Sequence, residues 1–373
     1  MRATRALIRL DHLAENIVLV KQKTGAALCM PVKANAYGHG ALPVAGAALA
    51  AGAEYLAVAT LEEGRELRKG GIDAPVMLLS IALPEEIDGI IAAGLEPFAG
   101  DAEYIDALEG RAARAGKKCA VHLKIDTGMG RIGCTPGQAL SLAARIAASR
   151  NLLLAGTATH LAVSDSPVPE DRAFTERQLD IFRGTVEGIK TAGIDPGLVH
   201  AANTGAVTFY NDSWFDMVRP GILLYGYSPE DSQGKPVMAV KPLMELSSSL
   251  VFIKELRRGE TVSYGRTWTA PEDTLIGTLP VGYADGLSRR LSGRWDVYAG
   301  SGKEGSLRPL AGRICMDQCM VDLGKDSGAR RWDRVSVFGG KAPHAGIMAA
   351  RLGTIPYEIT CGISPRVPRL YLA

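Results

Sequence analysis

The sequence lacks an excess of charge of either sign, and it lacks a long uncharged hydrophobic run. Its 42 Lys and Arg residues nearly balance 40 Asp and Glu residues, so the formal net charge is +2 over 373 residues. This balance gives no electrostatic footprint for nucleic acid or an anionic membrane surface. The most apolar stretch, residues 43–60, is interrupted by Glu54, whereas a membrane span needs about 20 apolar residues. The first residues carry Arg2, Arg5 and Arg9 without an apolar region, so we expect no signal peptide and a cytoplasmic protein.

Paired cysteines are also lacking. The six cysteines are scattered and lie mostly in apolar runs, which predicts buried free thiols in a reducing compartment. Cys315 and Cys319 form the closest pair, but no second pair or nearby His completes a zinc site. We therefore expect no metal centre. Internal repeats and low-complexity tracts are absent too, and the 22% content of charged residues beside abundant apolar ones excludes wholesale disorder.

Short β-type runs alternate with helical stretches from residue 26 to about residue 226. The predicted strands are 27–33, 55–60, 75–80, 95–99, 119–126, 153–160, 198–203 and 215–219. Strands that alternate with helices indicate βα units and a parallel sheet. Eight units are the number that closes a (β/α)8 barrel of the TIM type, although a doubly wound open sheet also alternates.

The helical signal fades after Pro236. Strands joined by Gly-rich turns are predicted at 243–256, 274–283, 296–300, 333–340 and 365–372. The polar segment 228–236 contains Gly and Pro and is typical of a linker. The sequence thus predicts an α/β barrel over residues 1–235 and a mainly β domain over residues 236–373.

Lys33 is the first candidate for chemistry. It lies in PVKANAYGHG (31–40), where a buried apolar run ends and a turn begins. Barrel enzymes place their active sites at this carboxyl end of their strands. Partial desolvation there lowers the pKa of a lysine and makes its amine a nucleophile or a Schiff-base former. Tyr37 and His39 follow in the same loop.

Polar residues end several other predicted strands in the same way. They are Lys124 and Asp126, His160, Asn203 and Thr204, and Arg219. Polar groups at the same end of so many strands indicate an active site. The loops after strands seven and eight commonly bind phosphate, where the Thr204 hydroxyl and the backbone N–H groups of Gly221 and Ile222 are suitable donors.

The segment GMGRIG (128–133) matches the dinucleotide fingerprint G-x-G-x-x-G. That fingerprint also needs an acidic residue about 20 positions further on, to hold the ribose. Residues 151–156 contain none. We therefore do not expect a nicotinamide cofactor, and the same glycines can instead aim Arg131 into the barrel mouth.

Motifs along almost the whole chain resemble those of bacterial alanine racemases, which are fold-type III pyridoxal-phosphate enzymes. They are PVKANAYGHG (31–40), LKIDTGMGRIG (123–133), TH (159–160), HAANTG (200–205), VRPGILLYG (218–226), VSYGRT (262–267), VGYADG (281–286), GRICMDQCMVD (312–322) and YEITCGISPRVPRLY (357–371). The resemblance implies an N-terminal barrel, a C-terminal β domain and the cofactor pyridoxal 5'-phosphate. It further implies interconversion of L- and D-alanine, a homodimer, and supply of D-alanine for peptidoglycan.

The resemblance also implies roles for residues around the cofactor. Lys33 would carry the cofactor covalently, and the phosphate would be held by Tyr37, Thr204, Gly221, Ile222 and Tyr357. Arg219 would face the pyridine nitrogen and Arg131 the phenolic oxygen, with His160 and Asn203 also at the cofactor. Lys124 matches a lysine that is carbamylated in many members and then orients Arg131. Position 204 is Thr where the family more often has Ser, but the hydroxyl remains.

Racemisation needs two acid/base groups on opposite faces of the substrate. The resemblance implies that Lys33 serves one face and Tyr264, from the partner subunit, the other. The backbone N–H of Met316, also from the partner, and Arg131 would bind the substrate. Tyr283 and Tyr357 would narrow the entrance, and the bulk of Tyr357 favours alanine.

Two other readings of the sequence stay open. One is a racemase of broader or serine specificity. The other is a non-catalytic pyridoxal-phosphate-binding protein, although such proteins lack the β domain and Tyr264.

Overall fold

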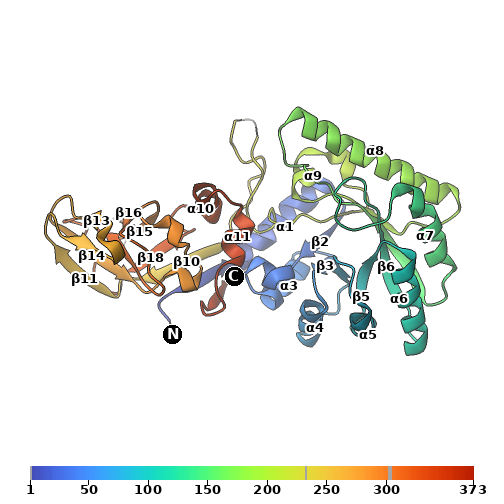
Figure 1. The fold of residues 1–373 in the computed structure, drawn as a ribbon, viewed down its shortest axis with the longest axis horizontal. Helices are drawn as coiled ribbons and strands as arrows, with labels where there is room; N and C mark the ends of the chain where they lie inside the picture. Colours follow the sequence, from blue (N-terminus) through green and yellow to red (C-terminus); the bar gives the residue numbers. More distant parts are fainter. Residues whose placement is uncertain (1, 232, 301–304) are drawn as a thin grey trace. The chain divides into compact units, whose positions relative to one another are not determined.

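The computed structural model describes residues 2–231, 233–300 and 305–373 (Figure 1). The chain forms two compact units. The barrel unit comprises His12–Ala36 and Ala41–Lys241, and the β unit comprises Pro242–Ala373 together with Tyr37–Gly40 and the residues up to Asp11. The division thus lies a few residues after the boundary of 235/236 expected from sequence, and the β unit includes two short segments from early in the chain.

The barrel unit contains eight parallel strands. They are β2 (Ala27–Pro31), β3 (Tyr55–Val58), β4 (Val76–Leu78), β5 (Leu95–Ala99), β6 (Cys119–Lys124), β7 (Leu152–Ala158), β8 (Leu198–His200) and β9 (Met217–Val218). Their order is β8-β7-β6-β5-β4-β3-β2-β9. The N–H groups of Asp216 and Arg219 donate to the carbonyls of Val199 and Ala202 at 3.0 and 2.8 Å, which links the two end strands. The sheet is therefore a nearly closed barrel, and the predicted fold class is confirmed.

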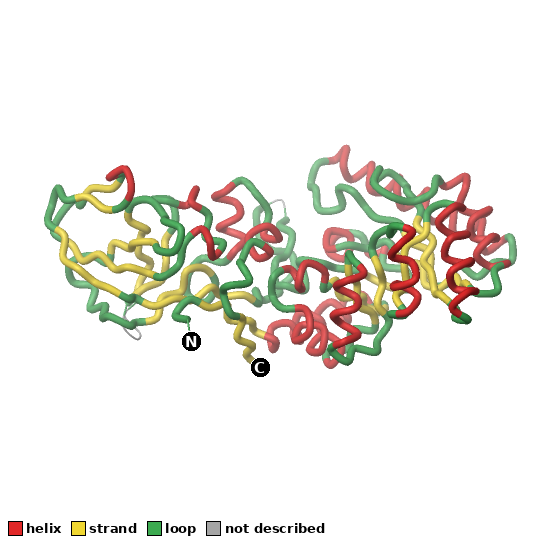
Figure 2. Tube along the Cα trace, turned by 60° about the horizontal axis from the view of Figure 1, so that its bottom comes forward, coloured by secondary structure: helices red, strands yellow, loops and turns green. Residues whose placement is uncertain are grey.

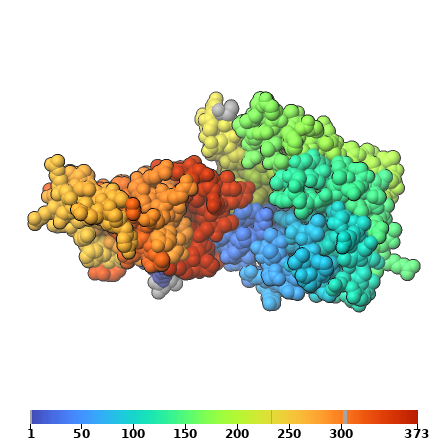
Figure 3. All heavy atoms as spheres, viewed as in Figure 1, coloured from blue at the N-terminus to red at the C-terminus, as the bar shows by residue number. Residues whose placement is uncertain are grey.

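Helices alternate with these strands, and Figure 2 shows red helices around the yellow strands of the barrel unit, whose atoms Figure 3 draws as spheres. They are α1 (Leu10–Thr24), α2 (Lys33–Tyr37), α3 (Ala41–Ala50), α4 (Leu61–Lys69), α5 (Ile87–Ala92), α6 (Ala102–Ala115), α7 (Pro136–Ala148), α8 (Pro169–Thr191) and α9 (Thr204–Phe209), with 3-10 turns η1 (Pro84–Glu86) and η2 (Asn211–Ser213). Local sequence defines their ends. In α4, Thr60 and Glu63 form a capping box, and α6 begins after Asp101 and stops at the left-handed Gly116.

Small and medium side chains from different strands fill the inside of the barrel. The cluster comprises Cys29, Ala57, Met77, Phe98, Ala158 and Met217, all buried. Four of the six cysteines are buried and all six are free thiols, as predicted. Polar side chains are buried in the barrel unit as well, namely His122, Lys124, His200 and Arg219. These buried polar groups belong to the candidate site.

The β unit is built on a nine-stranded sheet of order β11-β14-β17-β16-β15-β18-β10-β1-β19. Its strands are β1 (Arg5–Arg9), β10 (Met244–Ser249), β11 (Phe252–Leu256), β14 (Thr274–Leu279), β15 (Asp296–Ala299), β16 (Ser306–Ala311), β17 (Cys319–Asp322), β18 (Arg334–Phe338) and β19 (Arg369–Leu372). Strand β1 pairs antiparallel with β10 and parallel with β19. The N-terminal strand therefore belongs to this unit, and the run 243–256 forms two strands instead of one.

Smaller elements complete the β unit. They are the hairpin of β12 (Thr261–Val262) and β13 (Trp268–Thr269), the turns η3 (Tyr264–Arg266), η4 (Tyr283–Asp285) and η5 (Arg289–Leu291), and the helices α10 (Ala345–Leu352) and α11 (Pro356–Cys361). The sequence did not predict these two helices. Within the described ranges, no helix combines the length and apolar character that crossing a membrane requires.

Candidate functional site

Lys33 lies two residues after the end of β2 and precedes a left-handed turn of the backbone. Ala34, Asn35 and Ala36 have φ/ψ of 52/48, 53/49 and 52/54 degrees, and φ of Tyr37 is also 52 degrees. Left-handed helical backbone costs an L-residue about 1–2 kcal/mol. Consecutive non-glycine residues held in this region are rare, and such strain clusters at functional sites. The turn therefore marks the segment after Lys33 as a candidate site.

Hydrogen bonds hold the left-handed turn in place. The Ala36 N–H donates to the Val32 carbonyl at 2.8 Å. The Ala34 N–H donates to the Glu63 carboxylate at 2.6 Å, and the Asn35 side chain accepts from the Ala41 N–H at 2.8 Å. Partners from Val32, α3 and α4 thus offset part of the strain and fix the path of the chain after Lys33.

Tyr37 and Tyr357 lie together in the β unit. Their ring centroids are 5.4 Å apart with the planes at 48 degrees. Gly38 follows Tyr37 with φ of 83 degrees, and a Cβ added there would lie 2.2 Å from the Thr360 carbonyl oxygen. Only glycine permits this approach of segment 37–40 to α11. Two residues predicted to bind the same phosphate are therefore neighbours.

The cations at the carboxyl ends of the barrel strands act on one neutral histidine. Burial, together with the positive charges of Arg219, Lys124, Arg131 and Lys33, lowers the pKa of His160 to about 3. His160 is therefore an uncharged imidazole at neutral pH. Four of the residues chosen from sequence thus lie close enough together to affect the charge of a fifth.

Lys124 at the end of β6 is buried and its Nζ donates to the Ile125 carbonyl at 3.0 Å. Burial, and then the charge of Arg219, lower the pKa of the Lys124 amine to about 7, although Asp126 opposes this shift. A substantial fraction of Lys124 is consequently a neutral amine at physiological pH.

Asp126 shapes the loop that carries Arg131. Its carboxylate accepts from the N–H of Gly128 at 2.9 Å and from the N–H of Gly130 at 3.0 Å. Burial alone would raise the pKa of Asp126, but these N–H groups outweigh it and lower the pKa. The glycines of GMGRIG therefore bind a carboxylate of this chain and form the turn that presents Arg131, which is exposed.

Thr204 links the loops that follow β8 and β9. Its hydroxyl oxygen accepts from the N–H of Gly221 at 3.0 Å. Asn203 precedes it and caps α9, because its side chain accepts from the Ala206 N–H at 3.1 Å and from the Ser164 hydroxyl at 2.6 Å. The predicted phosphate donors Thr204 and Gly221 are thus in direct contact, next to the buried Ile222.

Arg219 is buried beyond the end of β9 and points its guanidinium at acceptors of the barrel unit. Its Nη2 donates to the carbonyls of Thr159 at 2.7 Å and Ala201 at 3.3 Å, and its Nη1 lies against Nδ1 of His200. Burial lowers the pKa of Arg219 to about 10, so it remains a cation at neutral pH. Burial also lowers the pKa of His200 well below its usual value.

His200 in turn contacts His122, which contacts Glu96, and the sequence analysis assigned no role to these residues. His122 on β6 lies 2.9 Å from His200 and 2.9 Å from the carboxylate of Glu96 on β5. The available signal was a histidine or glutamate within an otherwise apolar strand.

Tyr264, Tyr283 and Met316 cluster around one loop of the β unit, with exposed fractions of 71%, 42% and 53%. The Ser263 hydroxyl, next to Tyr264, donates to the Arg313 carbonyl at 2.7 Å. The N–H of Tyr283 donates to the Cys315 carbonyl at 3.1 Å. Segment 313–316 thus holds both tyrosines beside Met316, which the sequence assigned to the same shared site.

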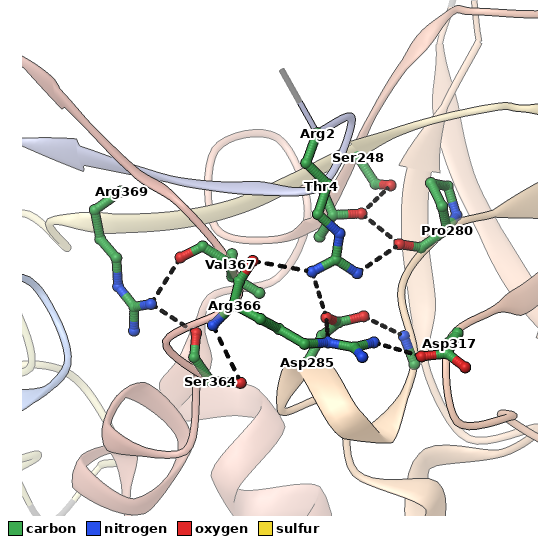
Figure 4. A network of polar contacts seen from close by, with 11 residues as sticks. Arg2, Thr4, Ser248, Pro280, Asp285, Asp317, Ser364, Arg366, Val367 and Arg369 are labelled. Atoms are coloured by element: carbon green, nitrogen blue, oxygen red, sulfur yellow. Dashed lines mark hydrogen bonds and ion pairs between the residues drawn. The ribbon is translucent and has the colours of Figure 1, made fainter.

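A buried carboxylate fixes the loops that carry Tyr283 and Met316 (Figure 4). The side chain of Asp285 is fully buried and contacts Arg2 Nη1 and Arg366 Nε, both at 2.6 Å. Arg366 also binds Asp317 at 2.6 Å, so it links the loop of Tyr283 to that of Met316. Sequence reasoning missed this network because its members are far apart in the chain.

The residues of the barrel mouth fit an anionic carbonyl cofactor such as pyridoxal phosphate. Lys33 supplies an amine and Thr204 a hydroxyl. Arg131 and Arg219 supply positively charged donors, and Lys124 supplies an amine that is charged in only part of the molecules at neutral pH. The carboxylate of Asp126, whose charge acts on Lys124, is already bound to backbone N–H groups. This donor set suits a phosphate and a phenolic oxygen.

Comparison with known proteins gives matches over both units. The family model described as alanine racemase, N-terminal domain, matches residues 8–229, and alanine racemase, C-terminal domain, matches residues 243–371. An alanine racemase of Treponema denticola is 48% identical over 100% of this chain and 99% of that protein. Among solved structures, alanine racemase from D-cycloserine producing Streptomyces lavendulae is 36% identical with a TM-score of 0.90, over 100% of this chain and 98% of that one. The Bacillus anthracis alanine racemase with bound L-Ala-P is 31% identical with a TM-score of 0.89, over 100% and 96% of the two chains.

Proposed function

Because this chain belongs to the alanine racemase family, we propose that it interconverts L- and D-alanine with pyridoxal 5'-phosphate and two catalytic groups, Lys33 and Tyr264. The observation that carries the proposal is the position of Lys33. It stands at the carboxyl end of β2, on a strained turn, near Lys124, Arg131 and Arg219. An amine in such a cationic site is suited to bind a carbonyl group borne by an anion.

Pyridoxal phosphate, when bound, supplies a carbonyl for the substrate amino group and a ring that acidifies the Cα–H bond. Lys33 would hold it covalently. Its phosphate would be held by residues that the family resemblance assigns to it, namely Tyr37, Thr204, Gly221, Ile222 and Tyr357. Asn203 would support Thr204. Arg131 would contact the phenolic oxygen.

The two catalytic groups divide the two faces of the substrate. The Lys33 amine exchanges the Cα proton on one face and the Tyr264 hydroxyl exchanges it on the other. Arg131 and the backbone N–H of Met316 bind the substrate carboxylate, and Tyr283 and Tyr357 limit the side chain to the size of a methyl group. His160 stays neutral beside Arg219, in line with the lowered pKa of its imidazole.

Arg219 is the residue that would face the ring nitrogen. A guanidinium has donors and no acceptor, so it cannot take a hydrogen bond from a protonated ring nitrogen. Arg219 would thus leave the ring nitrogen unprotonated and the ring a weaker electron acceptor, which would favour proton exchange over side reactions such as transamination. Arg219→Glu should raise transamination, measured as pyruvate formed during turnover. Unchanged pyruvate formation would contradict this role.

Lys124 is proposed to be carbamylated. Its pKa of about 7 leaves much of the amine neutral, and a neutral amine adds to carbon dioxide with formation of an N–C bond and release of one proton. The resulting anion would offset the charges of Arg219 and Arg131 and orient Arg131. Mass spectrometry of the intact protein at neutral pH, with and without bicarbonate, tests this addition.

Active sites shared in a homodimer are part of the proposal. The exposure of Tyr264 and Met316 on the β unit supports their contribution to the site of a second copy. Mixing inactive Lys33→Ala and Tyr264→Ala proteins should then restore about a quarter of wild-type activity, because half of the dimers are hybrids with one intact site. No restoration after verified subunit exchange would refute sharing.

Turnover by the purified protein tests the function itself. Pyridoxal phosphate and L-alanine are added, D-alanine is followed by chiral chromatography, and Lys33→Ala is the control. We expect D-alanine to form with the wild-type protein and not with Lys33→Ala. Faster racemisation of serine than of alanine would refute alanine as the preferred substrate. Supply of D-alanine for peptidoglycan, in the cytoplasm, predicts that deletion of the gene makes growth depend on added D-alanine.

A further inference from the structure

Four side chains form a continuous chain of hydrogen bonds inside the barrel unit. Glu96 Oε2 on β5 lies 2.9 Å from His122 Nε2 on β6, and His122 Nδ1 lies 2.9 Å from His200 Nε2 on β8. His200 Nδ1 contacts Arg219 Nη1 after β9. The two imidazoles are fully buried, and the Glu96 side chain retains only 15% of its exposure. A carboxylate in the middle of an apolar strand is thus connected to the arginine at the barrel mouth.

Donor chemistry sets one direction for this chain. Arg219 has only donors and an ionised Glu96 has only acceptors. Arg219 N–H therefore donates to His200 Nδ1, which leaves the His200 proton on Nε2. That proton is donated to His122 Nδ1, and the His122 proton on Nε2 is donated to Glu96. A proton on His122 Nδ1 would oblige His200 to carry its proton on Nδ1, where it would oppose the N–H of Arg219.

The surrounding sheet is shaped to admit His122. The register between β6 and β7 shifts between Val121 and His122, which is a β-bulge next to this residue. Gly156 stands opposite, and a Cβ there would lie 2.4 Å from His122 Nδ1, the atom that accepts from His200. Phe98 stacks near His200 with ring centroids 6.3 Å apart. The bulge, the glycine and the aromatic ring thus all make room for the contact between the imidazoles of His122 and His200.

We infer that Glu96, His122 and His200 are positioning residues that hold the guanidinium of Arg219 in one orientation, with Glu96 fixing the direction of every hydrogen bond in the chain. No proton needs to move along the chain for this role. The consequence for the ring nitrogen rests on the proposed function, whereas the direction of the hydrogen bonds does not.

Two substitutions of Glu96 separate its acceptor from its charge. In Glu96→Gln the amide oxygen still accepts from His122 Nε2–H, so the direction survives the loss of charge. In Glu96→Ala the His122 Nε2–H has no acceptor, and its proton can move to Nδ1. His200 must then carry its proton on Nδ1 and can no longer accept from Arg219. Glu103→Gln on the exposed surface of α6 is the matched control.

The first measurement is ¹⁵N NMR of histidine-labelled full-length protein, with and without pyridoxal phosphate. Signals of the two rings are assigned with His122→Gln and His200→Gln. Wild type and Glu96→Gln should carry a proton on Nε2 alone in both rings at pH 7. Glu96→Ala should lose this single tautomer in at least one ring. A wild-type ring protonated on Nδ1, or Glu96→Ala with unchanged tautomers, would overturn the inference.

The second measurement is steady-state racemisation by the same proteins. Loss of a hydrogen bond to a buried charged group predicts that Glu96→Ala lowers kcat by about tenfold or more, with KM nearly unchanged. Glu96→Gln should lose less, and Glu103→Gln nothing. Equal losses in the Gln and Ala variants would show that charge and not direction matters, and would refute the assignment. Correct tautomers in a wild-type protein that does not racemise alanine would refute the proposed function alone.

Discussion

Replacing Ala34 with glycine is expected to stabilise the protein, although Ala-to-Gly changes in helices usually destabilise. Ala34 is exposed and has φ of 52 and ψ of 48 degrees, in the left-handed turn after Lys33. Left-handed backbone costs alanine about 1–2 kcal/mol and glycine nothing. The larger backbone entropy of glycine in the unfolded chain offsets about 0.5–1 kcal/mol of this gain. The net stabilisation is then about 0.5–1 kcal/mol.

No other contact of Ala34 changes this estimate. Its methyl group is exposed, and its N–H donates to the Glu63 carboxylate at 2.6 Å, a bond that glycine also makes. The matched control is Ala144→Gly, because Ala144 is exposed in the right-handed helix α7. That change should destabilise by about 0.5–1 kcal/mol.

Thermal unfolding followed by circular dichroism distinguishes the two variants by the sign of the change in Tm. A shift of about 1–2 °C is expected for a unit of this size, upward for Ala34→Gly and downward for Ala144→Gly. A fall of the same size in both variants would refute the strain attributed to the turn.

Three further predictions concern buried groups. The pKa of Lys124 is 10.5 in the unfolded chain and about 7 in the folded protein. Between these values the unfolded chain binds one more proton than the folded protein, so stability rises with pH. Lys124→Met should flatten that rise, measured by urea unfolding at pH 7 and 9 in buffer free of carbon dioxide. Two arginines hold the pKa of Asp285 below 3.8 despite burial, so its contribution to the free energy of unfolding is present above pH 3.8 and is lost as pH falls through the folded pKa. Asp285→Asn should lower the free energy of unfolding by about 2 kcal/mol at pH 7 and by progressively less in acid. A loss that does not change with pH would contradict the ion pairs. Gly156→Ala would place a Cβ 2.4 Å from His122 Nδ1 and should lower Tm, whereas Gly184→Ala in α8, which meets nothing within 4 Å, should raise it.

The barrel could be predicted from the sequence because its signals are local. Each strand is a short apolar run bounded by turn residues, and polar side chains such as Lys124 and Arg219 follow directly where strands end. Parallel strands bring those ends to one side of the sheet. The grouping of site residues in the barrel unit follows from this arrangement and needs no knowledge of distant contacts.

Other parts depend on contacts between distant residues. Ala and Tyr give no local signal for left-handed backbone, and one Asn, which tolerates it, does not predict four such residues in a row. The close approach of Gly38 to Thr360 becomes visible only in the folded β unit. Glu96 and His122 come together because β5 and β6 are neighbours in the closed sheet. The helices α10 and α11 have only 8 and 6 residues, too few for a clear helical period.

The pairing of β1 determines when the β unit can be completed during synthesis. Its residues Ala6, Leu7 and Ile8 are buried between β10 and β19, yet they are synthesised long before both of these partner strands. At about 5–20 residues per second, Leu372 follows Arg9 by roughly 20–70 s. Until β10 and β19 have both been made, β1 is an apolar segment with at least one unpaired edge, and such edges favour chaperone binding and aggregation. The order of translation therefore leaves β1 without its full set of partner strands until β19 has been made.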